Sequence, residues 1–350
     1  MKKRNHIVSL IPCFVALYVM LSACSTDVDL YADYKDIPIV YGIIDADTDT
    51  NYVKIVRAFS GTNDQPINAG EVALIADSNN YPGKLDAKII ELMKDSYGDY
   101  TPTGRVFQLD TITIHDKEPG LFYAPDQKLY YTTERFKKDN AVHNRKYRYR
   151  LQILKKSDTV TAETGLVGGN VFELLTSRVE FSEALHSKGK VLFTSVNNGY
   201  LYDIHMHFRY KEKLPGQPMT NKVLTWSLGS FGLNELELES SGVYSVNYSG
   251  DTFFELLGKQ IGADTLNVER IIGSCFVSVA AGGLELYNYY IMNEHTTDLN
   301  QSIPDYTMLN NINGGYGLFS SRNEVEREVA LSSRTLYEII IHRGWGFRQE

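Results

Sequence analysis

The stretch "IPIVYGIIDADTDTNYVKIVRAF", residues 37–59, decides the fold class. Apolar side chains recur at every second position over 37–44 and again over 51–59, which is typical of strands that bury one face. Residues 45–50 between them consist of Asp, Thr and one Ala, the composition of a polar turn. This stretch therefore predicts two paired strands joined by a short loop.

Similar short segments continue the pattern up to residue 168. About seven strands over some 130 residues predict an immunoglobulin-like or fibronectin-like β-sandwich over 37–168. The further strand segments lie at 86–95, 105–116, 128–136, 146–156 and 158–167.

The second half, residues 169–350, is expected to be a β-rich domain with one packed helix near 252–261. In "DTFFELLGKQIG", apolar residues keep helical spacing, and Thr252 and Glu255 form a capping-box pattern. The fold class predicted for the whole chain is mainly β. The strands expected here lie at 189–196, 200–211, 221–229, 234–240, 274–283, 284–293 and 335–344.

The first 23 residues have the features of an export signal. A basic start is followed by an apolar run over 7–21 that is too short to read first as a spanning helix. The run ends in Leu21-Ser22-Ala23-Cys24, which resembles a bacterial lipobox. We expect cleavage before Cys24 and covalent acylation of its thiol, for example with palmitate, since two or more acyl chains anchor a protein stably. An ordinary cleaved signal with a chance cysteine is the alternative.

Residues 24–36 are expected to form a lipidated acidic tether. Asp27 and Asp29 follow Cys24 closely, and this resembles the signal that sends some lipoproteins of Bacteroidota-type bacteria to the outer face of the outer membrane. The predicted location is therefore the outer membrane, lipid-anchored and facing outside. A lipoprotein facing the periplasm is the alternative.

Charge and cysteine content narrow the function classes. The chain carries a net charge of −8, and residues 1–23 contain only basic charges, so their removal leaves a more acidic protein. Such a protein has no electrostatic footprint for nucleic acid. Cys13 leaves with the signal and Cys24 is expected to be acylated, so Cys275 has no partner for an intramolecular disulfide. We expect Cys275 to be a packed thiol rather than a nucleophile.

A possible metal site lies in "YDIHMHFRYK". On a strand, Asp203, His205 and His207 share one face and could chelate zinc or copper. Arg209 and Lys211 share that face and would oppose a cation. A half-buried strand with one wet face is the alternative.

A possible calcium site lies in "DADTDTN", where Asp45, Asp47 and Asp49 stand at every second position. An EF-hand loop also requires Gly and Glu at positions that here hold Thr50 and Val56. A polar hairpin loop is the alternative.

Motifs of catalysis are missing from the sequence. It contains no G-x-S-x-G and no H-E-x-x-H, and the glycine-rich 310–321 lacks the lysine of a phosphate loop. We therefore predict a non-enzymatic protein without a cofactor other than the lipid on Cys24. A hydrolase that uses carboxylates distant in sequence stays open, as does a binding role for the 24 tyrosines.

Four stretches occur in an order that resembles the Bacteroidota lipoproteins grouped as domain of unknown function 4249. They are "IVYGIIDADTDTNYVKIVRAF", "SGDTFFELLGKQI", "LELYNYYIM" and "YTMLNNINGGYGLFSS". The residues that match are Gly250, Phe253 and Phe254 of the helix, slightly shifted from the pattern, and Asn311, Ile312, Gly315, Gly317 and Phe319 of the late segment.

This resemblance implies a surface lipoprotein often encoded beside TonB-dependent transporters, and it transfers no catalytic residue. We expect a membrane partner through the lipid and a TonB-dependent transporter as a possible protein partner in nutrient uptake. A structural or adhesive envelope component is the alternative function.

Overall fold

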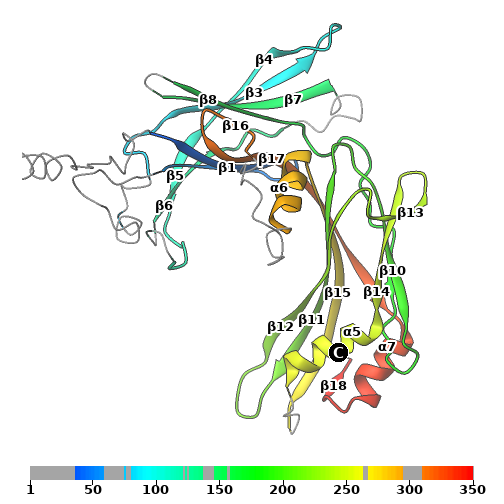
Figure 1. Ribbon diagram of the computed structural model, residues 1–350. Helices are drawn as coiled ribbons and strands as arrows, with labels where there is room; N and C mark the ends of the chain where they lie inside the picture. Colours follow the sequence, from blue (N-terminus) through cyan, green and yellow to red (C-terminus); the bar gives the residue numbers. More distant parts are fainter. Residues whose placement is uncertain are drawn as a thin grey trace, which may run out of the picture.

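The computed structural model describes residues 36–58, 75, 80–120, 123, 126–136, 146–155, 158–262, 267–294 and 310–349. Figure 1 shows two parts, and each surrounds its own hydrophobic core. Strands dominate both parts, so the predicted mainly β fold is confirmed. The predicted signal peptide and most of the tether, including Cys24, lie outside the described residues.

The first part is a β-sandwich. One sheet has the strand order β16-β8-β7-β3-β4, and the other is formed by the β17-β1-β2-β6-β5 end of a ten-stranded sheet. Apolar side chains from both sheets, such as Val40 and Ile55 on one and Ile89 and Leu151 on the other, fill the space between them. The strands of this part are β1 (Pro38–Asp45), β2 (Asn51–Arg57), β3 (Asp86–Lys94), β4 (Tyr100–Gln108), β5 (Asp110–Ile114), β6 (Gln127–Thr132), β7 (Tyr147–Leu154), β8 (Thr159–Thr164), β16 (Ile312–Asn313) and the first half of β17 (Tyr316–Leu331).

The segment 105–116, predicted as one strand, contributes to two. The chain changes sheets at Leu109: β4 pairs with β3 in one sheet, and β5 pairs with β6 in the other. Leu109 itself is fully buried. The sandwich therefore has one more strand from this stretch than its alternation predicts, because a period-two pattern carries no information about which sheet a strand joins.

The second part packs a three-stranded sheet, β10-β14-β13, and helical segments against the β12-β11-β15-β17 end of the ten-stranded sheet (Figure 1). Its elements are β9 (Arg178–Val179), β10 (Lys188–Thr194), β11 (Leu201–Lys213), β12 (Thr220–Gly232), β13 (Glu237–Ser240), β14 (Val243–Ser249), α5 (Gly250–Ile261), β15 (Glu269–Gly282), α6 (Leu284–Glu294), the later half of β17, α7 (Ser333–Tyr337), the π-helix η2 (Glu338–His342) and β18 (Phe347–Arg348).

Helix α5 confirms the helix predicted near 252–261, and it buries Phe253, Phe254 and Leu257. The predicted capping box is wrong, because α5 begins at Gly250, before Thr252, and no side chain caps it. Glu255 instead forms an ion pair with Lys259 one turn later, with 2.6 Å between Oε1 and Nζ.

Two other predictions are wrong. Residues 284–293 and 335–344 were expected to be strands, but they fall in α6 and in α7 with η2. The first stretch is rich in tyrosine and the second in isoleucine, and the strand preference of both residue types is weak against tertiary packing. A local signal existed for α7: the Ser332 hydroxyl accepts a hydrogen bond from the Thr335 N–H at 3.1 Å, as a helix N-cap does.

Strand β17 joins the two parts. It pairs in parallel with β1 over residues 316–322 and antiparallel with β15 over residues 322–329. Ile312 and Phe319 contribute to the core of the first part. After residue 310 the chain thus returns to the sandwich, although the sequence analysis ends the sandwich domain at residue 168.

Candidate functional site

The outer face of β11 carries the polar residues that the sequence singled out. The predicted alternation of this strand is confirmed, since one row of side chains is buried in the core and the other faces outward. The buried row consists of Tyr202, Ile204, Met206, Phe208 and Tyr210.

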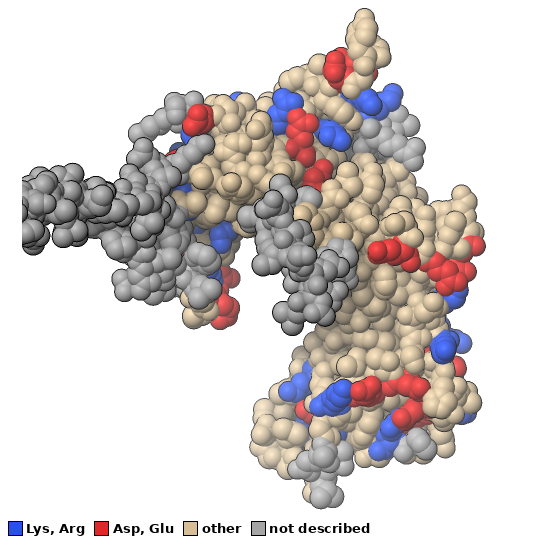
Figure 2. Space-filling view, in the orientation of Figure 1, with Lys and Arg blue, Asp and Glu red and all other residues tan. Residues whose placement is uncertain are grey.

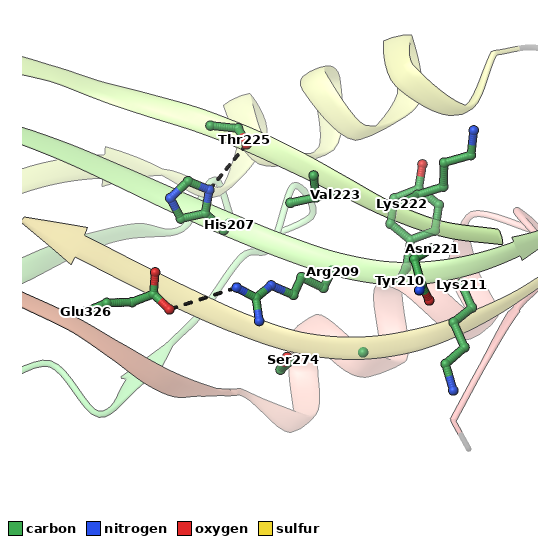
Figure 3. A pocket seen from close by; sticks show the side chains of 11 residues that line it. His207, Arg209, Tyr210, Lys211, Asn221, Lys222, Val223, Thr225, Ser274 and Glu326 are labelled. Atoms are coloured by element: carbon green, nitrogen blue, oxygen red, sulfur yellow. Dashed lines mark hydrogen bonds and ion pairs between the residues drawn. The ribbon is translucent and has the colours of Figure 1, made fainter. Parts of the chain in front are cut away.

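A groove of about 670 Å³ lies on this outer face. Figure 3 shows side chains from four strands around it: His207 and Arg209 of β11, Thr225 of β12, Ser274 of β15 and Glu326 of β17. Its volume falls in the range of roughly 300–1,000 Å³ that is common for small-ligand sites. We call it the sheet groove and take it as the candidate binding site.

His207 sits at one end of the sheet groove with both ring nitrogens engaged. Nδ1 lies 3.2 Å from the Thr225 hydroxyl, and Nε2 lies 3.4 Å from the Ser278 hydroxyl. Burial, and secondarily the neighbouring His205, lower the pKa of His207. The ring is therefore neutral near pH 7 and acts as a hydrogen-bonding group rather than a cation.

Arg209 provides the central charge of the sheet groove. Its guanidinium carbon lies 4.1 Å from the centre of the Phe276 ring, a cation–π contact, and a guanidinium nitrogen lies 3.9 Å from a Glu326 oxygen. A guanidinium stacked in this way can still present its edge to a planar acceptor such as a carboxylate. Lys211 and Lys222 also line the groove. On the face of the molecule shown in Figure 2, acidic and basic side chains are interspersed.

The predicted zinc or copper ligands are only partly brought together. A His205 nitrogen bonds with the Asp203 carboxylate at 2.9 Å, and the other oxygen of Asp203 accepts from the Ser230 hydroxyl, also at 2.9 Å. The rings of His205 and His207 lie 6.0 Å apart. Within the described ranges, no group of three or more His, Cys, Asp or Glu side chains is arranged to hold a metal ion. The geometry agrees better with the alternative, a polar strand face.

The predicted calcium ligands belong to the hairpin between β1 and β2, and protein groups engage each of them. Asp45 accepts from the Asp47 N–H at 2.9 Å and lies 3.4 Å from Arg322. The other two carboxylates also have partners: Asp47 accepts from Asn323 at 2.6 Å, and Asp49 pairs with Arg135. The geometry again agrees better with the alternative, a hairpin loop closed by its own side chains.

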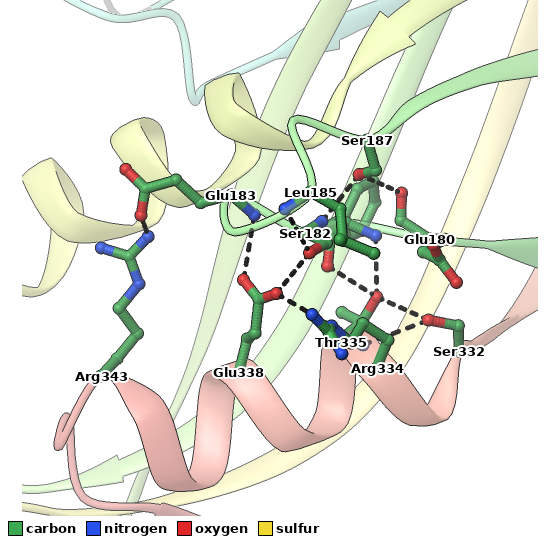
Figure 4. A network of polar contacts seen from close by, with 11 residues as sticks. Glu180, Ser182, Glu183, Leu185, Ser187, Ser332, Arg334, Thr335, Glu338 and Arg343 are labelled. Atoms are coloured by element: carbon green, nitrogen blue, oxygen red, sulfur yellow. Dashed lines mark hydrogen bonds and ion pairs between the residues drawn. The ribbon is translucent and has the colours of Figure 1, made fainter.

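One acid–hydroxyl cluster outside the sheet groove resembles catalytic machinery in its residue types. Glu338, at the junction of α7 and η2, accepts from the Ser182 hydroxyl and from the Glu183 N–H, the latter at 2.9 Å (Figure 4). Ser182 is fully buried and Glu338 is 2% exposed. The cluster therefore binds the loop 180–187 to the helix, and a substrate cannot reach it.

Cys275 is buried in the core of the second part, as expected for a packed thiol. Burial raises its pKa to about 12, so the thiolate is scarce at neutral pH.

Sequence reasoning missed the residues that neighbouring strands bring to the sheet groove. Thr225 and Phe276 face His207 in register, although they lie 18 and 69 positions away along the chain. The sequence of β17 does contain a period-two pattern. Glu324, Glu326 and Glu328 stand at every second position, and all three are exposed. Nothing local shows that this row lies near β11.

Comparisons with known proteins identify no family. No protein-family model matches the sequence, and no curated protein matches it. Among solved structures, the crystal structure of CBD12 from CALX1.2 matches with 8% identity and a TM-score of 0.18, over 84% of this chain and 99% of that chain. A likeness this weak carries no argument. The resemblance to the lipoprotein family of unknown function stays a prediction.

Within the part of the chain that the structure describes, no helix is both long and apolar enough to cross a membrane.

Proposed function

We propose that this protein is a non-enzymatic, lipid-anchored binding or accessory module on the outer face of the outer membrane. The observation that carries the proposal is the lipobox ending in Cys24, followed at once by an acidic tether. The sheet groove supports it, because the groove offers hydrogen-bonding and cationic groups on an open sheet surface.

The junction between tether and sandwich supports an anchoring role. Lys155, almost buried, donates to the Asp36 carbonyl at 2.6 Å and lies 3.2 Å from its carboxylate. The Tyr81 hydroxyl donates to the same carboxylate at 3.0 Å. The tether therefore leaves the sandwich at a fixed point.

Membrane fractionation tests the anchor. Cys24→Ala removes the acylation site, and we expect the variant to be lost from the outer-membrane fraction. Ser22→Thr keeps the cysteine and should stay in that fraction. Protease digestion of intact cells then distinguishes the two orientations, since only a surface-exposed protein is cleaved.

A TonB-dependent transporter is the partner we propose. Gentle solubilisation of the outer membrane and affinity capture through a C-terminal tag should retain such a transporter in stoichiometric amount. Capture of this protein by itself would reject the accessory role and leave free ligand binding.

One observation favours the alternative of a structural or adhesive component. Strand β12 is 13 residues long and ends the ten-stranded sheet, and an edge strand can pair with a strand of a neighbouring subunit. Electron microscopy of wild-type and deletion cells tests this role, since surface filaments that disappear with the gene would support it over ligand binding.

A further inference from the structure

The outward face of the β1–β2 pair is unusual for a strand surface that faces solvent. Sheets of this kind normally carry polar side chains on the outside. Here the outward row of β1 is apolar up to Asp45 at its end, with Ile39, Tyr41 and Ile43, of which Tyr41 is 46% and Ile43 is 39% exposed. Apolar side chains gathered on a surface in this way mark interaction sites.

A groove of about 380 Å³ crosses this face, and we call it the tether-side groove because it begins three residues after Asp36. Ile39, Tyr41 and Val56 form its apolar side, and Tyr41 and Lys54 face each other in register across β1 and β2. Lys117, Tyr123, Asp126 and Gln127 also line it.

Three cationic side chains, Lys54, Arg57 and Lys117, line this otherwise largely apolar groove. Lys54 is half-buried, and the partner of its ammonium is the neutral Gln127 side chain, 3.5 Å away. Lys117 lines the same groove and donates to the Tyr123 carbonyl at 2.5 Å. Burial, and then the charge of Lys117, lower the pKa of Lys54.

The carboxylate in the described lining of the groove is already engaged. Among the described residues that line the groove, Asp126 is the acid, and it bonds with His115 at 2.7 Å. None of the ion pairs within the described ranges involves Lys54. The charge of Lys54 and the apolar side chains around it are thus complementary to a ligand that is both anionic and apolar.

We propose that the tether-side groove binds an amphiphilic organic anion, with a carboxylate or phosphate at Lys54 and Lys117 and an apolar body against Ile39, Tyr41 and Val56. Two sources share this chemistry: a free organic carboxylate and the headgroup region of an anionic lipid, which the tether would keep nearby. The site is distinct from the sheet groove and needs no transporter.

Titration calorimetry of the full-length protein in a neutral detergent tests the proposal. Octanoate should bind, whereas octanamide, which has the same chain without the charge, should bind at least about tenfold more weakly. Lys54→Gln and Lys117→Gln should each weaken octanoate binding by a similar factor. Lys213→Gln, the same charge change on an exposed residue of β11, should leave it unchanged.

Short-chain phosphatidylglycerol and phosphatidylcholine distinguish the two sources. If phosphatidylglycerol and octanoate both bind, and both need the lysines, the groove is assigned to an anionic lipid. If octanoate binds and phosphatidylglycerol does not, the groove is assigned to a free carboxylate. Circular dichroism confirms that the variants are folded. Absence of binding, or binding that both groove variants retain in full, would overturn the proposal.

Discussion

At the scale of single residues, two buried groups have roles that their neighbours define. Glu338 is a carboxylate that satisfies a buried hydroxyl and a backbone N–H. Cys275 is a thiol whose surroundings keep it protonated. Neither is available to a substrate, and both contribute to stability in ways that can be measured.

Glu338→Ala should lower the free energy of unfolding by about 2–3 kcal/mol, because it leaves the buried Ser182 hydroxyl and the part-buried Glu183 N–H without their acceptor. Urea unfolding followed by circular dichroism measures the change. Glu255→Ala removes an exposed ion pair on α5 and should cost less than about 1 kcal/mol. Equal losses in the two variants would contradict the role given to Glu338.

The raised pKa of Cys275 predicts a pH dependence. In the unfolded chain the thiol ionises near pH 9, whereas in the folded protein it keeps its proton to about pH 12. The folded state therefore binds more protons between these values, and stability falls there by up to roughly 1.4 kcal/mol per pH unit.

Cys275→Ala should be less stable at pH 8 but should lose stability less steeply between pH 9 and 11. Urea unfolding at several pH values measures the slope of stability against pH for each protein. Burial also raises the pKa of Tyr202 to about 12, and this residue contributes equally to both slopes. Identical slopes would show that the thiol does not take part.

At the scale of elements, the hairpin between β1 and β2 is closed by Asn51. This side chain is 3% exposed, accepts from the Asp45 N–H at 2.6 Å and donates to the Asp45 carbonyl at 3.0 Å. The loop acids that suggested calcium are arranged around this closure, and the element holds its shape through its own hydrogen bonds.

Asn51→Ala should therefore destabilise the protein by about 2 kcal/mol. Asp49→Ala in the same loop removes an exposed carboxylate and should change stability by less than about 1 kcal/mol. Thermal melts of both variants and the wild type, with and without calcium chloride, make the measurement. A rise in the wild-type melting temperature with calcium, lost in Asp49→Ala, would restore the calcium site.

At the scale of the whole molecule, β17 makes one sheet out of two parts. Its close approach to β1 depends on Gly317, which has a φ of +121° and stands where a Cβ would overlap the Val40 carbonyl oxygen. Because β17 contributes to both parts, unfolding of one part removes strand pairs from the other. We expect calorimetry of the wild type to show a single cooperative transition.

Gly317→Ala should cost roughly 3 kcal/mol or more and should separate the melting of the two parts. Gly104→Ala is a matched control, since Gly104 also has a positive φ, +92°, but no atom lies within 4 Å of its added Cβ. We expect about 1–2 kcal/mol there, from backbone strain alone, and an undivided transition. A single transition in both variants would contradict the linking role of β17.

The sequence by itself determined the class of each element whose periodicity was strong. The alternation of β1, β2 and β11 and the helical spacing of α5 depend on local geometry, which a short window of residues reports. The same information predicted which side chains of β11 face the core and which face solvent.

Only the tertiary structure decided what depends on partners far apart in the chain. Residues 284–293 became helical although their composition favours a strand, the stretch after Leu109 joined the other sheet, and Glu326 came to lie beside Arg209. The tether-side groove likewise required two paired strands and a segment 60 residues later. Local periodicity determines on which face of a strand or helix a side chain lies. Which side chain it then contacts depends on packing between segments that are distant in the chain.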